Sequence, residues 1–307
     1  MKLMVPNFWY TKNILSLVLY PLSIVYRAIS FCISYVPKNQ IYKPKAKIIR
    51  VGNITMGGAG KTPVVLALTK MLQKNKIAIL TRGYKGKLLG PIILNENHSL
   101  EEAGDEALLL LKLAPTCVSK DRLEGIKFLE NLGYEIIITD DGMQDNRFES
   151  FCTIMVIDGH FGFGNKMLFP AGLLRETIVS GVKKSDFAVV IGEGEFDLAL
   201  PMLRADLVSK ASLNGQKVIA FAGIGNPDKF FHSVARAGGN IIERIAFADH
   251  YQYTKKDMEY LLSLGHQLIT TEKDYVRIDE MYKDRIQTLP VELVFSDKNK
   301  LQKLLNL

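Results

Sequence analysis

Short apolar runs and longer amphipathic stretches follow one another along most of the chain. The apolar runs predict buried strands, and they cover residues 46–53, 76–84, 134–141, 152–159 and 186–192. The stretch 62–75 instead predicts a helix, with one apolar face that consists of Val64, Val65, Leu68, Met71 and Leu72. Strands that alternate with helices predict an α/β fold with a parallel sheet wound on both faces.

The C-terminal third repeats this alternation on a smaller scale. It predicts a strand, a turn and a helix over 215–234, a helix over 254–265 and a further strand over 266–274. We therefore expect a smaller α/β domain there. The expected organisation is an N-terminal helix at 1–38, a main domain at 39–205 and the smaller domain at 206–307.

The most apolar part of the chain is the predicted helix at residues 13–36, whose only charge is Arg27. Its polar residues, with Lys38 just beyond, share an arc of about 100° on a helical wheel. They are Asn13, Ser16, Ser23, Arg27, Ser30, Ser34 and Lys38. A helix that lies in a membrane interface, or that packs this stripe on the protein, needs such an arc, whereas a lipid-surrounded span does not. We favour a membrane-lying helix, and a buried core helix or a true span remain the alternatives. Pro21 is expected to kink the helix or to begin its second half.

Composition and charge narrow the picture only a little. Hydrophobic residues make up 48% and charged residues 23% of the chain, which excludes disorder over most of its length. Lys and Arg number 39 against 32 Asp and Glu, so the net charge of +7 favours anionic partners without choosing among them. Three distant cysteines without a C-x-x-C pair argue against a structural zinc site or a disulfide framework.

The stretch GNITMGGAGKTPVV at residues 52–65 is the strongest chemical signal. The phosphate-binding pattern is G-x-x-x-x-G-K-[ST], and here its first position is Thr55. A strand before the loop and a helix after it supply the backbone N–H groups and the helix dipole that attract phosphate. Lys61 would reach the terminal phosphates, and the Thr62 hydroxyl would bind Mg²⁺. The predicted nucleotide-binding residues here are Thr55, Met56, Gly57, Gly58, Ala59, Gly60, Lys61 and Thr62.

Paired aspartates at the end of an apolar strand complete this signal. Asp140 and Asp141 occupy the position of the Walker B acid, which holds Mg²⁺ directly or through water. Asp158, at the end of the next apolar run, is the weaker alternative. Residues 270–278 lack the Asn-Lys-x-Asp spacing typical of GTPases, so ATP is favoured over GTP.

Several segments together resemble one family. VGNITMGGAGKTP, TRGYKG, GDEALLL, DDGMQD, FPAGLLRE, FADHYQYT and TTEKDYVRI occur in this order, and the chain up to about residue 280 resembles the tetraacyldisaccharide 4′-kinase (lipid A 4′-kinase) family of Gram-negative bacteria. The resemblance implies a P-loop domain and a smaller α/β domain with a cleft between them. It implies that ATP and Mg²⁺ are used to phosphorylate the 4′-hydroxyl of a membrane-embedded tetraacylated disaccharide 1-phosphate. This reaction takes place at the cytoplasmic face of the inner membrane, whose anionic surface would be a partner, and no nucleic acid is expected.

The family's motifs also imply roles for individual residues. Asp105 matches the catalytic base, and His250 matches the partner that orients it across the two domains. Glu106 is a candidate Mg²⁺ ligand. Arg122 and Arg175 are candidate phosphate clamps, and Glu176 is a candidate nucleotide or metal contact. For these last four residues a structural ion pair is the alternative. For Asp105 the alternative is an ordinary helix N-cap or first-turn acid, and for His250 it is a surface or capping histidine.

One position departs from the family, and one rival function remains. The Asp-Asp-Gly-x-Gln segment commonly continues with His, but here the residue is Asp145, so a substrate contact at this position is in doubt. The rival is a P-loop ATPase or GTPase that acts as a switch or a metal-delivery chaperone. Such a protein would hydrolyse nucleotide without an acceptor and would bind a partner protein.

Overall fold

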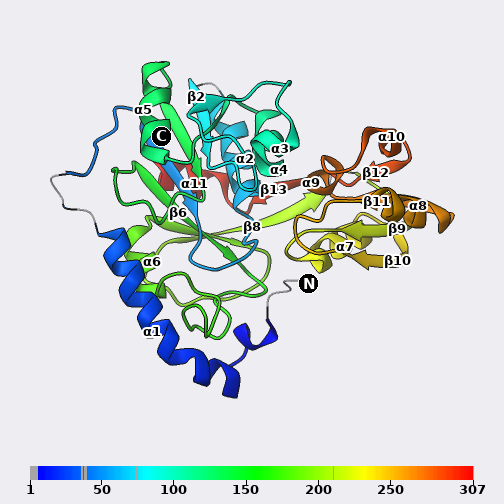
Figure 1. Ribbon diagram of the computed structural model, residues 1–307, viewed down its shortest axis with the longest axis horizontal. Coiled ribbons are helices and arrows are strands. Elements are labelled where there is room, and N and C mark those ends of the chain that lie inside the picture. The colour runs from blue at the N-terminus through cyan, green and yellow to red at the C-terminus, as the bar shows by residue number, and fades with distance from the viewer. Residues whose placement is uncertain (1–5, 36, 38–39, 74, 210, 307) are drawn as a thin grey trace. The chain divides into compact units, whose positions relative to one another are not determined.

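The computed structural model describes residues 6–35, 37, 40–73, 75–209 and 211–306 (Figure 1). Contacts divide the chain into two compact units. The large unit runs up to Asp206 and takes in the C-terminal segment from Leu293 onward. The small unit is Leu207–Glu292. Each unit is described by itself below.

A nine-stranded sheet forms the centre of the large unit, in the order β13-β8-β7-β6-β1-β5-β2-β4-β3. Its strands are β1 Lys47–Gly52, β2 Ile77–Thr81, β3 Ile92–Ile93, β4 Thr116–Val118, β5 Ile136–Asp140, β6 Cys152–Asp158, β7 Phe187–Ile191, β8 Met202–Ser209 and β13 Val291–Phe295. The pairs from β4 through β2, β5, β1, β6 and β7 to β8 are parallel, and β3 is antiparallel to β4. Every residue of β2, β5, β6 and β7 is buried, which is typical of strands covered on both faces. The predicted α/β class is confirmed.

Helices cover this sheet. They are α2 Lys61–Leu72, α3 Leu100–Ala103, α4 Asp105–Leu111, α5 Arg122–Asn131, α6 Ile178–Lys184 and α11 Lys298–Leu305. Of these, α3, α5, α6 and α11 begin at Ser, Thr or Asp residues whose side chains cap them. Ile126 and Leu129 of α5 pack on Leu80 of β2 and Ile137 of β5 in one buried cluster. Helix α2 packs on β1 and β5, so it is held above the two strands whose ends carry the candidate site.

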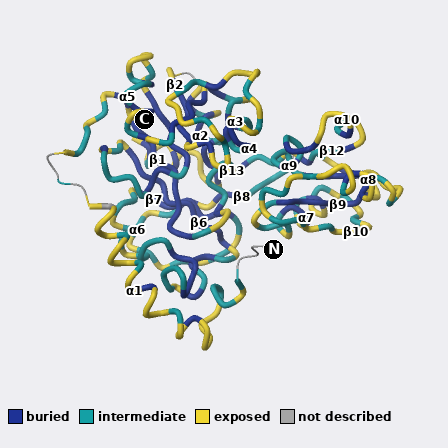
Figure 2. Tube along the Cα trace, viewed as in Figure 1, coloured by how far each residue is buried: buried dark blue, intermediate teal, exposed yellow. Residues whose placement is uncertain are grey.

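The N-terminal helix α1 (Ile14–Ser34) follows a short 3₁₀ turn, η1 (Asn7–Trp9), and runs through Pro21 as one helix. It is long and apolar enough to cross a membrane by length and composition, yet only 11% of its most apolar window is buried. Figure 2 shows most of α1 as exposed. Its exposed apolar residues are Ile14, Leu15, Leu17, Val18, Tyr20, Leu22, Ile24, Val25, Ile29, Phe31 and Ile33.

The polar stripe of α1 faces the protein in part. Ser16 and Ser23 are buried, and the Ser23 hydroxyl donates to the Leu168 carbonyl at 2.8 Å and accepts from the Ala171 N–H at 3.1 Å. Arg27 is exposed, and Lys38 lies outside the described residues. Ser23 therefore fastens α1 to the loop before Arg175, and most of the apolar side chains of α1 stay exposed.

The small unit contains a four-stranded parallel sheet in the order β10-β9-β11-β12. Its elements are β9 Lys217–Ala222, α7 Pro227–Arg236, β10 Asn240–Ala246, α8 Lys255–Ser263, β11 Gln267–Thr270, α9 Glu272–Tyr275, α10 Glu280–Lys283 and β12 Ile286–Thr288. The strand expected at 266–274 ends earlier, because the Thr271 hydroxyl accepts from the Asp274 N–H at 2.9 Å and caps a short helix.

The C-terminal segment differs from the expected boundary at 206–307. Strand β13 joins the nine-stranded sheet beside β8, and the Ser296 N–H donates to the Arg204 carbonyl at 2.9 Å. Leu301 and Leu305 of α11 are then buried at 0% and 1% exposure. Residues 293–306 therefore belong to the large unit, since their apolar face is covered there.

This placement gives a stability prediction. Leu301→Ala should lower the free energy of unfolding by about 2–5 kcal/mol, because it leaves a cavity at a fully buried position. Lys303→Ala, on the exposed side of the same helix, should change it by less than about 0.5 kcal/mol. Denaturant unfolding in detergent measures both. Equal stability of the two variants would contradict the packing of α11.

Candidate active site

The glycine loop joins β1 to α2, as the sequence predicts. Gly57 and Gly60 have φ angles of +100° and +89°, which residues with a Cβ rarely adopt. Gly60 is also the N-cap of α2, so the first backbone N–H groups of the helix open onto this loop. The loop therefore has the local geometry of an anion site, and the assignment of its residues 55–62 to a nucleotide stays a prediction.

Thr55 and its neighbour Asn53 hold the loop from within. The fully buried Asn53 amide donates to the Thr55 hydroxyl at 2.9 Å and to the Thr55 carbonyl at 3.0 Å. The Met56 N–H donates to the Leu173 carbonyl at 2.7 Å. A glycine at position 55 would lose the hydroxyl that Asn53 binds. Sequence reasoning missed Asn53, although a buried amide directly after a strand is a recognisable signal.

Lys61 ties the glycine loop to the end of β5. Its Nζ donates to Asn53 Oδ1 at 3.1 Å and lies 3.4 Å from Asp141 Oδ1. Arg175 Nη1 lies 3.2 and 3.3 Å from the two Asp141 oxygens. Burial alone would raise the pKa of Asp141, but Lys61, Arg175 and Arg122 outweigh it and lower this pKa to about 2. Asp141 is therefore an anion that holds the Lys61 ammonium in place.

Asp140 has the opposite environment. It is 4% exposed, and its Oδ1 has no hydrogen-bond partner among the residues that the structure describes. Burial first and the Glu106 charge second raise the pKa of Asp140 to about 7, against the opposing effect of Lys61. An orphaned buried carboxylate oxygen is costly without a cation. The position therefore fits a metal ligand.

The residues near Asp140 fit Mg²⁺ better than a metal ion that takes all of its ligands from protein side chains. Within the described ranges, no group of three or more His, Cys, Asp or Glu side chains is arranged to hold a metal ion. Mg²⁺ characteristically takes one or two carboxylates and completes its shell with water and substrate phosphates. Asp140 and the Thr62 hydroxyl at the start of α2 would hold it, with Asp141 and Glu106 as the further predicted ligands.

Asp105 is the first residue of α4 and is 4% exposed. Its Oδ1 accepts from the Glu106 N–H at 2.9 Å. The preceding Gly104 has φ +86°, and a Cβ there would lie 2.3 Å from the Tyr84 carbonyl. This turn fixes the carboxylate at a helix N-terminus, where negative charge is favoured. Its role as a base stays a prediction.

The remaining predicted residues of the large unit already have structural partners. Glu176 accepts from Ser180 Oγ at 2.7 Å and pairs with Lys184 Nζ at 2.8 Å. Arg122 is buried and donates to the Asp141 carbonyl. Asp158 caps its own turn, since its Oδ1 accepts from the His160 N–H at 2.9 Å. These contacts favour supporting roles for all three.

Asp145, at the position where the family commonly has His, forms an ion pair. Its two oxygens accept from Arg147 Nε at 2.9 Å and Nη2 at 2.7 Å, and Arg147 Nη1 reaches Asp121 Oδ2 at 2.8 Å. Asp121 in turn caps α5. Burial opposes ionisation, but the Arg147 hydrogen bonds lower the pKa of Asp145. Asp145 and Arg147 therefore fasten the loop after Asp141 to α5, which no local sequence signal reveals.

His250 lies in the small unit on a strained turn. Its φ is +55°, and its N–H donates to the Gly223 carbonyl at 2.9 Å. The imidazole Nε2 lies 3.4 Å from Lys273 Nζ. Since Asp105 belongs to the large unit, its pairing with His250 stays a prediction.

A buried ion pair supports this turn, and sequence reasoning missed it. The Asp274 and Arg277 side chains are 0% and 1% exposed and 2.8 Å apart. Asp274 Oδ1 also accepts from the Gly223 N–H at 2.9 Å and from the Tyr253 hydroxyl at 2.8 Å. A buried pair with these additional hydrogen bonds fixes local geometry, and the removal of one partner would be costly.

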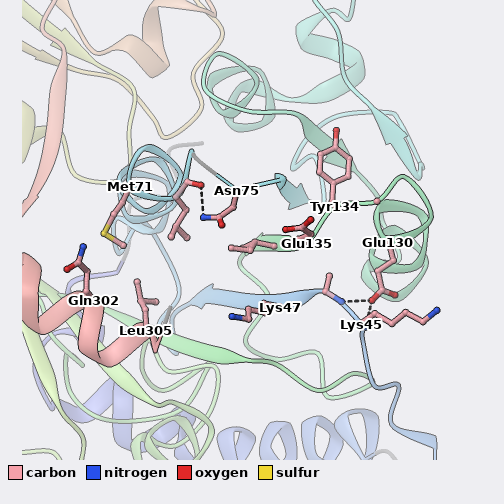
Figure 3. Close-up of a pocket in the computed structure, with 13 residues that line it drawn as sticks. Lys45, Lys47, Met71, Asn75, Glu130, Tyr134, Glu135, Gln302 and Leu305 are labelled. Carbon is pink, nitrogen blue, oxygen red and sulfur yellow. Dashed lines mark hydrogen bonds between the residues drawn. The ribbon is translucent and has the colours of Figure 1, made fainter.

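A sizeable cavity lies away from these residues. It encloses about 640 Å³ and is lined by Lys45, Lys47, Met71, Glu130, Tyr134 and others (Figure 3). These residues surround the first residues of β1 and β5, whereas ligands of wound α/β folds bind at the carboxyl ends of the strands. The Glu130 carboxylate there is engaged by the Tyr42 hydroxyl at 2.6 Å and the Ala46 N–H at 2.9 Å. This cavity is therefore not the phosphate site.

Comparisons with known proteins agree with one another. A model of the LpxK family, described as tetraacyldisaccharide-1-P 4′-kinase, matches residues 15–307. A tetraacyldisaccharide 4′-kinase of Paramagnetospirillum magneticum is 39% identical over 306 residues and covers 94% of this chain and 93% of its own. One of Rhodospirillum rubrum is 35% identical over 317 residues, with 95% and 94% covered.

A solved structure is also similar. LpxK from Aquifex aeolicus, described as an apo form in complex with ATP, superposes with a TM-score of 0.77 at 28% identity. The match covers 95% of this chain and 99% of that one. These matches do not favour the alternative of a nucleotide-dependent switch or metal-delivery chaperone.

The contrast between the two aspartates gives a pH prediction. Because Asp140 must be ionised to hold Mg²⁺ and its folded pKa is raised, Mg²⁺-dependent nucleotide binding should weaken as pH falls from about 8 to about 6. Asp141, with its lowered pKa, stays ionised over this range. Calorimetric titration at several pH values measures the effect. In Asp140→Asn the affinity should be lower and should retain only the pH dependence of the nucleotide. An unchanged pH profile in this variant would contradict the assignment.

Proposed function

The chain belongs to the tetraacyldisaccharide-1-P 4′-kinase family, and we propose that it transfers the γ-phosphoryl group of ATP to the 4′-hydroxyl of a tetraacyldisaccharide 1-phosphate in lipid A biosynthesis. The observation that carries the proposal is the Lys61 contact with both Asn53 and Asp141, beside a buried Asp140 Oδ1 that has no hydrogen-bond partner among the described residues. It joins a phosphate-binding loop to a metal-binding strand end.

The transfer needs three contributions from the chain. The loop N–H groups and Lys61 bind the β- and γ-phosphates and offset charge as the bond from the γ-phosphorus to the bridging oxygen breaks. Asp105 accepts the proton of the 4′-hydroxyl while the oxygen of that hydroxyl bonds to the γ-phosphorus, and ADP leaves. His250 orients the Asp105 carboxylate. Thr62 and Asp140 would hold Mg²⁺, which would supply positive charge to neutralise the phosphates.

The exposed apolar surface of helix α1 favours an acceptor substrate that resides in a membrane. Its apolar side chains are exposed on the side away from Ser16 and Ser23, and such a contiguous surface is typical of an interfacial helix. We place the enzyme on the cytoplasmic face of the inner membrane, with α1 lying on its anionic surface rather than spanning it. This placement brings the catalytic residues to an acylated sugar without extracting it from lipid.

The base assignment predicts a selective loss of turnover. Asp105→Asn should lower kcat for phosphoryl transfer by about 10²–10⁴-fold, because the amide cannot take the hydroxyl proton. ATP affinity should change little, since the phosphates are bound by the loop. Transfer of labelled γ-phosphate from ATP to the disaccharide 1-phosphate in mixed micelles measures kcat. Asp197→Asn, at an exposed position of the same unit, is the matched control. If Asp105→Asn retains near wild-type kcat, another group is the base. If the folded wild-type protein transfers no phosphate in lipid, the proposed function is wrong.

The membrane assignment predicts a second result. Leu22→Asn combined with Ile29→Asn places two amides on the exposed face of α1, where the side chains are 55% and 54% exposed. Each change removes apolar area from the membrane contact, so co-sedimentation with anionic vesicles should fall by more than about tenfold. Leu132→Asn, at an equally exposed site on α5's end, should sediment like wild type. Equal sedimentation of all three proteins would show that α1 is not the anchor.

A further inference from the structure

Lys273 contacts the Nε2 atom of the His250 imidazole, and this contact determines which tautomer the ring adopts. The two side chains approach to 3.4 Å between Lys273 Nζ and His250 Nε2. An ammonium carries three donors and no acceptor, so in this hydrogen bond Nε2 must be the acceptor. The ring then carries its proton on Nδ1. The Asp249 carboxylate lies 3.8 Å from the same Nε2, which is beyond hydrogen-bond distance.

One buried guanidinium holds both halves of this contact. Arg277 Nε donates to the Lys273 carbonyl at 3.1 Å, and its Nη1 donates to the Gly223 carbonyl at 3.1 Å. The same Gly223 carbonyl accepts the His250 N–H at 2.9 Å. The Arg277 guanidinium therefore fixes the backbones of Lys273 and His250 relative to each other.

Asp274 locks that guanidinium. Besides its 2.8 Å contact with Arg277 Nη2, it accepts from the Gly223 N–H at 2.9 Å and from the Thr271 hydroxyl at 2.6 Å. Two backbone segments, the turn at Gly223 and residues 271–277, thus meet at one carboxylate that is fully buried. The φ of +55° at His250 is a costly conformation, and a turn of this kind persists only where the surroundings determine it. The network supplies that determination.

We propose that Lys273 is a positioning residue for the phosphoryl transfer: it fixes His250 as the neutral Nδ1–H tautomer, on a platform made by Asp274 and Arg277. The proposal rests on the proposed function, in which His250 orients the base Asp105. In this tautomer the ring presents an N–H donor at Nδ1, which is the group that the proposed role of His250, the orientation of a carboxylate base, requires. A ring protonated on Nε2 instead would present a lone pair at Nδ1 and repel the carboxylate.

The tautomer is measured directly by NMR of the full-length protein labelled with ¹⁵N-histidine, in detergent. The chain has five histidines, so His250→Ala identifies the His250 signals by their loss. Multiple-bond ¹H–¹⁵N correlation distinguishes a protonated ring nitrogen from a bare one. The wild type should show Nδ1–H, Lys273→Arg should keep it, and Lys273→Met should lose it. An Nε2–H tautomer in the wild type would overturn the proposal. An Nδ1–H tautomer that persists in Lys273→Met would overturn it as well, and both results are independent of whether the protein is a kinase.

A double-mutant cycle tests the consequence for catalysis. Lys273→Met should lower kcat by about 10- to 100-fold with little change in KM for ATP, and Lys273→Arg should restore part of it. In the His250→Ala background the same change should cost less than about twofold, because the lysine acts through the imidazole. Lys217→Met, at the opposite end of β9 from Gly223, is the charge-matched control. A 10- to 100-fold loss of kcat in both backgrounds, or no loss of kcat in either, would contradict the positioning role of Lys273. The kinase assignment would be unaffected by either result.

Discussion

The contact of Lys61 with Asn53 and Asp141 is the constraint on which the candidate site depends. β1 and β5 are neighbours in the sheet, so the glycine loop after one and the aspartates after the other meet at the same edge. Lys61 spans that edge, and Arg175 neutralises Asp141 from a third segment. Asp141 contacts these cations, whereas the adjacent Asp140 is buried and its Oδ1 has no hydrogen-bond partner in the part of the chain that the structure describes. Two residues side by side in the sequence are thereby given different tasks.

Hydrogen bonds also connect the N-terminal helix α1 to the candidate site. Ser23 of α1 binds the backbone at Leu168 and Ala171, and the same loop continues to Leu173, which binds the Met56 N–H in the glycine loop. The helix that we place on the membrane is therefore connected through a few hydrogen bonds to the phosphate-binding loop. The buried Asp274–Arg277 pair does comparable work in the small unit, where it shapes the turn that carries His250.

The sequence predicts the fold class and the phosphate loop because both depend on local patterns. Apolar runs end at Asp140 and Asp158 as predicted, and Gly60 precedes α2. Contacts between distant segments could not be predicted. The pairing of Asp145 with Arg147 and Asp121, the burial of Arg122 and the return of β13 to the large sheet all depend on tertiary packing. The strand expected at 266–274 ends at Thr270 for a local reason, the Thr271 cap, which competed with the apolar pattern.

The central claim is that the loop before α2 and the end of β5 form one nucleotide and metal site. A crystal structure with a non-hydrolysable ATP analogue and Mn²⁺, whose anomalous signal locates the metal, tests this claim most directly. The account predicts the β- and γ-phosphates on the N–H groups of residues 57–62, and the metal peak within coordination distance of Thr62 Oγ1 and Asp140 Oδ1, directly or through one water. A metal peak away from Asp140, or phosphates bound outside this loop, would contradict it.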